Sequence, residues 1–160
     1  DRIKENPNIA NIETSYNYYK YTLNIDLDLV GVDENFGIKL TRKEKLERIQ
    51  ALIEATKFLY RDRRGRREDL KPLFVVGGVY PVKNPFFHNA VNIAWKAGKP
   101  NLNMQAIDQI LNINLNDKKV SDYTATGTQK GEFENIDLEI SPYEAIDKIK
   151  EEVKKAYESN

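Results

Sequence analysis

The 160-residue chain contains no cysteine and only one histidine. The absence of cysteine excludes disulfides, thiolate chemistry and cysteine-based metal sites, and it favours a reducing compartment such as the cytoplasm. No apolar run approaches the roughly 18 residues of a membrane-spanning helix, so we expect no membrane partner. The phosphate-loop patterns G-x-x-x-x-G-K-[ST] and G-x-G-x-x-G do not occur. Nucleotide-driven chemistry therefore has no support, and we expect no cofactor.

Residues for other catalysis are also scarce. His88 has no cysteine partner and no H-E-x-x-H context, so a structural role is the simpler interpretation. Asp26 and Asp28 alternate on one side of a predicted strand and could bind a metal or act as an acid/base pair. Solvated carboxylates on a strand are far commoner. We expect no catalytic residue and no metal ligand.

The chain lacks net charge, with 25 basic and 25 acidic residues. This balance argues against a strongly basic nucleic-acid binder, but it is an average over opposing segments. Residues 41–71 carry a net charge of +5 and residues 72–130 carry +3, whereas residues 1–40 carry −3 and residues 131–160 carry −5. The middle of the chain is therefore basic and its ends are acidic.

The pattern of apolar residues predicts an α+β fold. Predicted strands cover 18–29, 72–80, 88–96 and 133–140, predicted helices cover 42–60, 103–112 and 142–157, and 114–131 is a predicted loop. The order β-α-β-β-α-β-α matches a ferredoxin-like, RRM-type antiparallel sheet with helices on one face. We expect one domain over residues 1–160. Because residue 1 is Asp, we interpret the chain as the C-terminal part of a longer protein, with an incomplete sheet whose open edge favours pairing with another chain.

An arginine cluster is the strongest local signal. It comprises Arg61, Arg63, Arg64, Arg66 and Arg67, with Gly65 as a turn or helix-ending glycine. Arginine binds phosphate oxygens through a planar fork and stacks on bases, which indicates contact with nucleic acid. The alternative is that these side chains complement a helix C-terminus and pair with Glu68 or Asp69. We include Lys57 and Lys83 as secondary phosphate contacts.

Tyr18 and Lys20 lie on the polar side of the first predicted strand, where a base could stack beside a phosphate. The alternative for Tyr18 is that it covers a sheet edge or a subunit contact.

Two stretches together resemble a known family. YTLNIDLDLVGVD (21–33), followed by a helix and LYRDRRGRREDLKPLFVVGGVYPVKNPFF (59–87), is similar to the DevR-type CRISPR-associated proteins of the RAMP superfamily. The resemblance covers about residues 20–90, and residues 97–160 add little to it. Family members are about twice as long as this chain, with a first strand and helix upstream.

The resemblance implies a backbone subunit of a type I interference (Cascade-like) complex for antiviral defence. Such subunits have an RRM-like palm and polymerise along one CRISPR RNA, which they hold by its phosphates. The implied partners are CRISPR RNA, copies of the chain itself, other subunits of the complex and, indirectly, target DNA. The subunit is not an enzyme in this reading. The alternatives are a metal-independent RNA-processing endonuclease of the same superfamily and a protein-interaction module whose arginines dock on an acidic surface such as 132–158.

Overall fold

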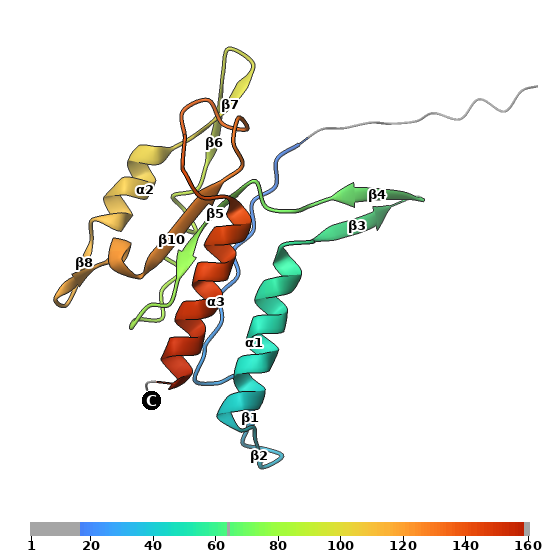
Figure 1. The fold of residues 1–160 in the computed structure, drawn as a ribbon, viewed down its shortest axis with the longest axis vertical. Helices are drawn as coiled ribbons and strands as arrows, with labels where there is room; N and C mark the ends of the chain where they lie inside the picture. Colours follow the sequence, from blue (N-terminus) through green and yellow to red (C-terminus); the bar gives the residue numbers. More distant parts are fainter. Residues whose placement is uncertain (1–16, 64, 159–160) are drawn as a thin grey trace, which may run out of the picture.

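The computed structural model describes residues 17–63 and 65–158. They form an α+β structure with three α-helices and small antiparallel sheets, as predicted, compatible with a ferredoxin-like arrangement (Figure 1). The helices are α1 (Arg42–Thr56), α2 (Met104–Leu111) and α3 (Pro142–Glu158), with a 3-10 helix η1 (Val120–Tyr123). The strands are β1 (Val32–Asp33), β2 (Ile38–Lys39), β3 (Tyr60–Arg63), β4 (Arg66–Asp69), β5 (Phe74–Gly78), β6 (Ile93–Lys96), β7 (Lys99–Leu102), β8 (Asn114–Leu115), β9 (Lys118–Lys119) and β10 (Thr124–Thr128).

The centre of the structure is the antiparallel pair of β5 and β10, in which Phe74 lies opposite Thr128. Helix α3 packs on this pair, and α1 lies beside α3 (Figure 1). Four buried side chains join the two helices: Ile49, Ile53, Ile146 and Val153. We call α1, α3, β5 and β10 the body.

The two long helices begin where the sequence predicts. Thr41 Oγ1 accepts a hydrogen bond from the Glu44 backbone N–H at 3.3 Å, and Glu44 Oε2 accepts one from the Thr41 N–H at 2.8 Å. Ser141 and Glu144 repeat this reciprocal arrangement at the start of α3, at 3.2 and 2.7 Å. Each box satisfies backbone donors that a helix N-terminus otherwise leaves unpaired.

Close backbone approach explains two glycines of the central pair. A Cβ on Gly78 would lie 1.7 Å from the Tyr123 carbonyl oxygen, and one on Gly127 would lie 2.3 Å from the Ser141 carbonyl oxygen. Such contacts exclude any side chain. Gly78 lies in the predicted strand 72–80, whereas Gly127 falls in the predicted loop 114–131.

A second apolar cluster lies under α2. It combines Phe87 and Ala90 from the segment after β5 with Ile107 of α2 and Val120 of η1. None of the three α-helices in the described part of the chain is long and apolar enough to cross a bilayer.

The predicted strand over 18–29 is wrong as a hydrogen-bonded strand. Residues 17–26 are extended, and within the described residues no backbone–backbone hydrogen bond joins residues 19–25 to another segment. The predicted alternation holds only in part: Ile25 and Leu27 pack on the cluster between α1 and α3, and Thr22 bonds His88 on the other side. Four other residues of the side predicted to be buried are 48–64% exposed: Tyr19, Tyr21, Leu23 and Leu29. Side chains thus hold this extended segment (residues 17–26) in place.

Other differences lie in the second half of the chain. The predicted loop 114–131 contains β10, whose threonines and glycine give no apolar run, and the predicted strand 133–140 is a turn-rich segment. Its Asn135 side-chain amide bonds the Leu102 backbone N–H at 3.0 Å and its carbonyl at 2.7 Å, so a side chain replaces the expected ladder. The predicted strand 88–96 shortens to β6.

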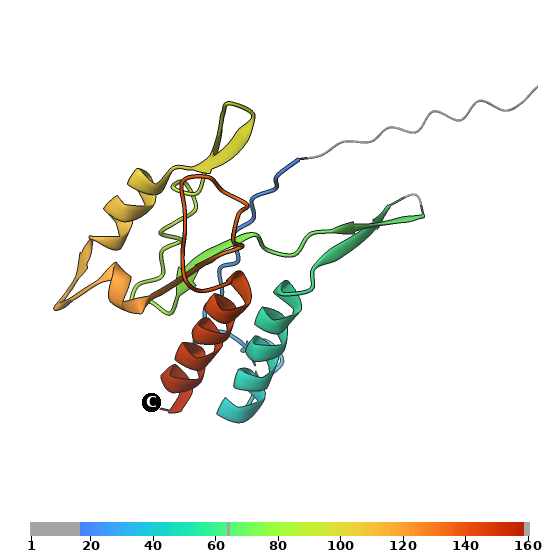
Figure 2. The ribbon, with the colours of Figure 1, turned by 45° about the horizontal axis from the view of Figure 1, so that its top comes forward.

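Helix α1 ends at Thr56, one turn before the predicted 60, and the arginine cluster follows as the β3–β4 hairpin. This hairpin (residues 60–69) projects away from the body in both ribbon views (Figures 1 and 2). Its ladder continues to its base, where the Leu70 N–H donates to the Leu59 carbonyl at 2.9 Å.

Candidate nucleic-acid interface

The register of the hairpin sorts its side chains onto two faces. Tyr60 lies opposite Asp69, Arg61 opposite Glu68, Asp62 opposite Arg67, and Arg63 opposite Arg66. Directly opposed residues share a face, and neighbours along a strand alternate. Gly65 stands at the turn with φ +74°, a conformation that glycine adopts without strain. Arg64 lies outside the described residues.

We call Tyr60, Asp62, Arg67 and Asp69 the compensated face, because its one arginine meets two aspartates. Arg67 donates to Asp62 from Nε at 3.0 Å and from Nη2 at 3.2 Å, and its guanidinium lies 4.1 Å from the centre of the Tyr60 ring. The hydrogen bond with Asp62 raises the pKa of Arg67. Lys71 pairs with Asp69 at 2.8 Å. The charges of this face are therefore already neutralised.

We call Arg61, Arg63, Arg66 and Glu68 the cationic face, because three arginines meet one glutamate. Arg61 donates to Glu68 Oε2 from Nε at 2.7 Å and also contacts it through Nη2. Arg63 and Arg66 lie directly opposite each other, and neither has an ion pair or hydrogen-bond partner among the described side chains. Like charges opposite each other on a sheet are destabilising, so this pair has a cost that a bound anion would relieve.

Lys57, a predicted phosphate contact, lies at the junction of α1 and α3 instead. Its side chain is 9% exposed, and its Nζ lies 2.5 Å from Asp147 Oδ1 and 3.2 Å from Glu54 Oε2. Burial alone would lower the pKa of Lys57, but the contacts with Asp147 and Glu54 outweigh it and raise that pKa. This charge is engaged within the body.

Lys83, the other secondary candidate, binds the two carboxylates that sequence reasoning weighed as a catalytic or metal-binding pair. Its Nζ lies 2.8 Å from Asp26 Oδ2 and 3.1 Å from Asp28 Oδ2. The hydrogen bond with Lys83 lowers the pKa of Asp26, and Asp26 and Asp28 together raise the pKa of Lys83. Within the described residues no group of three or more histidine and carboxylate side chains is placed to hold a metal ion.

Tyr18 packs against aromatic residues of the second half of the chain. Its hydroxyl donates to Glu132, and its ring centre lies 5.7 Å from that of Trp95 and 6.0 Å from that of Phe133. These contacts engage the ring and the hydroxyl of Tyr18 within the chain. Sequence reasoning missed the next residue, Tyr19, which is 64% exposed. The period-two pattern assigns Tyr19 to the buried side, which hides it as a candidate.

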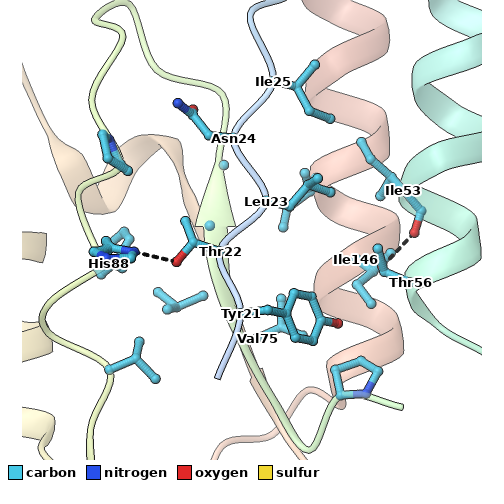
Figure 3. A pocket seen from close by; sticks show the side chains of 18 of the residues that line it. Tyr21, Thr22, Leu23, Asn24, Ile25, Ile53, Thr56, Val75, His88 and Ile146 are labelled. Atoms are coloured by element: carbon cyan, nitrogen blue, oxygen red, sulfur yellow. Dashed lines mark hydrogen bonds between the residues drawn. The ribbon is translucent and has the colours of Figure 1, made fainter. Parts of the chain in front are cut away.

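A cavity of about 1760 Å³ extends along the extended segment, between it, β5 and the two long helices. Figure 3 shows Tyr21, Leu23 and Ile25 directed toward the helices, and Thr22 turned the other way to His88. Thr22 Oγ1 lies 2.9 Å from His88 Nδ1, so the one histidine helps to hold the segment. Tyr19 and Arg61 line the same cavity.

A comparison with protein families identifies the chain. The model of a family described as the CRISPR-associated negative auto-regulator DevR/Csa2 matches residues 1–97, more than half of the chain. The chain belongs to the DevR/Csa2 family. Neither the curated proteins nor the solved structures give a significant match to the chain.

Membership of the DevR/Csa2 family confirms the predicted CRISPR association and implies a role alongside the other components of a CRISPR system. The matched range contains α1, the β3–β4 hairpin and β5, whereas β10 and α3 lie beyond it. The candidate interface therefore lies entirely on the part of the DevR/Csa2 chain that carries the family signal.

Proposed function

We propose that this DevR/Csa2-family chain is a non-catalytic RNA-binding backbone subunit of a type I interference complex, which holds guide RNA by its phosphates. The observation that carries the proposal is that Arg63 and Arg66, opposite each other on the cationic face, have no ion-pair or hydrogen-bond partner among the described side chains. Arginine forks favour phosphate oxygens, and the two guanidinium groups have no competing carboxylate among the described side chains. Contact through phosphates makes binding tolerant of sequence, as a subunit that serves any guide requires.

A binding role is also supported by how the polar residues outside the hairpin are engaged. His88 bonds Thr22, while Asp26 and Asp28 share Lys83. These contacts hold the extended segment, and they engage the side chains that the sequence offers as catalytic candidates. We expect repeat RNA to remain intact after incubation with the chain, with or without Mg²⁺.

The salt dependence of RNA binding tests the proposal. Each phosphate contact on a single strand contributes about −0.7 to the slope of log affinity against log salt concentration. The double variant Arg63→Ala/Arg66→Ala should flatten the slope by about 1.4 and weaken RNAs of unrelated sequence alike, as measured by fluorescence anisotropy.

Two controls match this experiment. Arg67→Ala removes one arginine from the compensated face, and Lys43→Ala/Lys154→Ala removes the same net charge as the double variant from α1 and α3. Both should leave the slope nearly unchanged. Equal losses in the controls and the double variant would show that binding depends on overall charge and would sink the assignment of the cationic face.

Polymerisation along RNA is part of the proposal, and the projection of the hairpin beyond the body supports it (Figure 2). Copies bound to one RNA should increase in number with RNA length, as measured by light scattering of size-separated complexes. A fixed stoichiometry on long and short RNAs would contradict assembly. The alternative is that the hairpin docks on an acidic protein surface. In that case the chain would not assemble along RNA and would form a complex with its protein partner.

A further inference from the structure

Two short turns lie at opposite ends of the molecule. Figure 1 shows the turn between β1 and β2 at the bottom of the view and the turn between β6 and β7 at its top. We call them the acidic tip (residues 33–38) and the basic tip (residues 95–99). A contact between opposite ends of two copies repeats from one copy to the next, so it builds an open row of subunits unless the rotation closes a ring.

The acidic tip presents apolar side chains beside a carboxylate. Phe36 is 79% exposed and Ile38 is 50% exposed. Asp33 Oδ1 holds the turn, because it accepts hydrogen bonds from the backbone N–H groups of Asn35 at 3.0 Å and Phe36 at 3.3 Å. Glu34 is exposed, and its carboxylate has no ion-pair or hydrogen-bond partner among the described residues. A turn that is already formed loses little freedom on binding, which favours its use as a contact.

The basic tip presents the complementary pair, an aromatic ring and a cation. Trp95 is 57% exposed, and its ring centre lies 5.7 Å from that of Tyr18, which supports it from one side. Lys96 lies directly opposite Lys99. Lys99 Nζ lies 2.7 Å from Glu134 Oε1, whereas Lys96 has no carboxylate partner among the described side chains. Like charges opposite each other on a sheet are destabilising, so a carboxylate from a neighbouring molecule would stabilise this tip.

We propose that the acidic tip of one copy docks on the basic tip of the next. Phe36 packs on the Trp95 ring of the neighbouring copy, and the Glu34 carboxylate pairs with its free lysine. The charges select unlike ends, because two acidic tips or two basic tips would bring like charges together. The tips bury little area, so the contact is weak between free copies and is strengthened when several copies share one RNA.

This contact goes beyond the proposed function, because it joins protein to protein and needs no RNA. It uses no residue of the cationic face, whose Arg63 and Arg66 lie on the β3–β4 hairpin. Assembly and RNA binding can therefore be measured separately on the same chain.

Sedimentation velocity of the RNA-free chain over a range of concentrations tests the contact. The unaltered chain should form complexes that grow in size with concentration, as a contact between unlike ends requires. Phe36→Ser should weaken association by about 30-fold, the loss typical of an aromatic anchor. Lys96→Glu should weaken it by at least about tenfold, because two carboxylates then face each other.

Two matched controls lie away from the tips. Phe58→Ser removes another exposed phenylalanine, 68% exposed, and Lys43→Glu makes the same change of charge as Lys96→Glu on the outer surface of α1. Both control variants should assemble like the unaltered chain. Equal losses in the controls would show that association depends on overall charge and hydrophobicity, which would overturn the docking of the tips.

Mixing experiments test the pairing of unlike ends. Phe36→Ser disables the acidic tip and Lys96→Glu disables the basic tip, so an equimolar mixture keeps one working pair of tips. The mixture should give a dimer with one copy of each variant and nothing larger. The double variant Glu34→Lys/Lys96→Glu exchanges the two charges and should recover assembly, which also shows that the altered chains remain folded.

The outcomes distinguish this inference from the proposed function. An unaltered chain that stays monomeric at every concentration, or a mixture that stays monomeric, would overturn the contact between the tips. A single variant that dimerises with itself would overturn the pairing of unlike ends. The proposed function is measured on an RNA short enough for one copy, where Arg63→Ala/Arg66→Ala should weaken binding and Phe36→Ser should not.

Discussion

The body and the hairpin are both rich in charge, and they use it in opposite ways. In the body, Lys57 and Lys150 reach across from one helix to the other: Lys57 binds Asp147, and Lys150 Nζ lies 2.5 Å from Glu54 Oε2. At the tip of the hairpin, Arg63 and Arg66 face each other without a carboxylate among the described residues. The charges differ because of where they lie. The helices pack together, so their side chains reach partners, whereas the hairpin projects away from the body.

The ion pairs of the body hold the protein together, whereas the charges at the tip of the hairpin are available to a ligand. The arginine cluster in the sequence does not show which of its charges are available. Arg61 and Arg67 belong to the same cluster, but each is already paired with a carboxylate within the hairpin. An isolated two-stranded hairpin is marginally stable in water, so the hairpin contributes little to holding the body together. Substitutions in the two regions should therefore affect different measurements.

The largest expected effect lies in the apolar interior of the body. Ile49 is 2% exposed and joins α1 to α3, so Ile49→Ala should lower the free energy of unfolding by about 2–5 kcal/mol. Urea unfolding followed by circular dichroism measures this loss. Leu52→Ala on the same helix, where the side chain is 47% exposed, is the control and should cost far less. Equal losses would contradict the assigned packing.

The next effect concerns the charges of the body. Lys57→Met removes the cation that bridges Asp147 and Glu54, and it should cost roughly 1–2 kcal/mol, below the usual range for a buried pair because both partners are partly exposed. RNA affinity should not change. Lys43→Met is the surface control, since Lys43 is 85% exposed and lies 3.9 Å from Glu47. A drop in RNA affinity with unchanged stability would place Lys57 at the interface, as the sequence suggests.

A smaller effect separates the two faces of the hairpin. Glu68→Gln removes the carboxylate that holds Arg61, so it should tighten RNA binding by about 1.5- to 5-fold at low salt. Asp62→Asn makes the same change of net charge on the compensated face and should tighten binding less. Titrations of both variants at equal ionic strength measure the difference. The reverse order would mean that RNA binds the face of Arg67.

The smallest effect is the acid sensitivity of the body. Hydrogen bonds with Lys150 and then Lys57 lower the pKa of Glu54 below its ordinary 4.5. The Glu54 carboxylate therefore contributes fully to stability above about pH 4.5. This contribution is lost as the pH falls through the lower pKa that Glu54 has in the folded protein. Glu54→Gln should flatten the fall in melting temperature between neutral pH and about pH 3. An unchanged acid profile would show that the Lys150 contact is too exposed to matter.

The sequence predicts those parts of the fold that depend on local signals. The boxes at Thr41 and Ser141 mark the starts of α1 and α3, and the apolar run before Tyr80 marks β5. The pairing of strands that lie far apart in the chain leaves no such local signal in the sequence. Strand β10 is a strand because it pairs with β5, and its threonines and Gly127 look like a loop when read alone.

The candidate site shows the same division. The arginine cluster and its glycine indicate an anion-binding turn, but only the register shows that Arg63 meets Arg66 while Arg67 meets Asp62. Tyr18 was the expected stacking residue because it lies on the polar side of the segment. Its actual neighbours, Trp95 and Glu132, come from distant parts of the chain that periodicity cannot place.

The extended segment has a consequence for how the protein exchanges hydrogen with water. Within the described residues, strand β5 has a ladder on one edge only, and no ladder joins residues 19–25 to another strand. Amides without a backbone partner exchange quickly, whereas those shared by β5 and β10 should be protected up to the stability of the body. An unladdered segment beside a half-paired strand is also a template for another strand. Slow exchange along residues 19–25 would therefore report that a further strand has joined them.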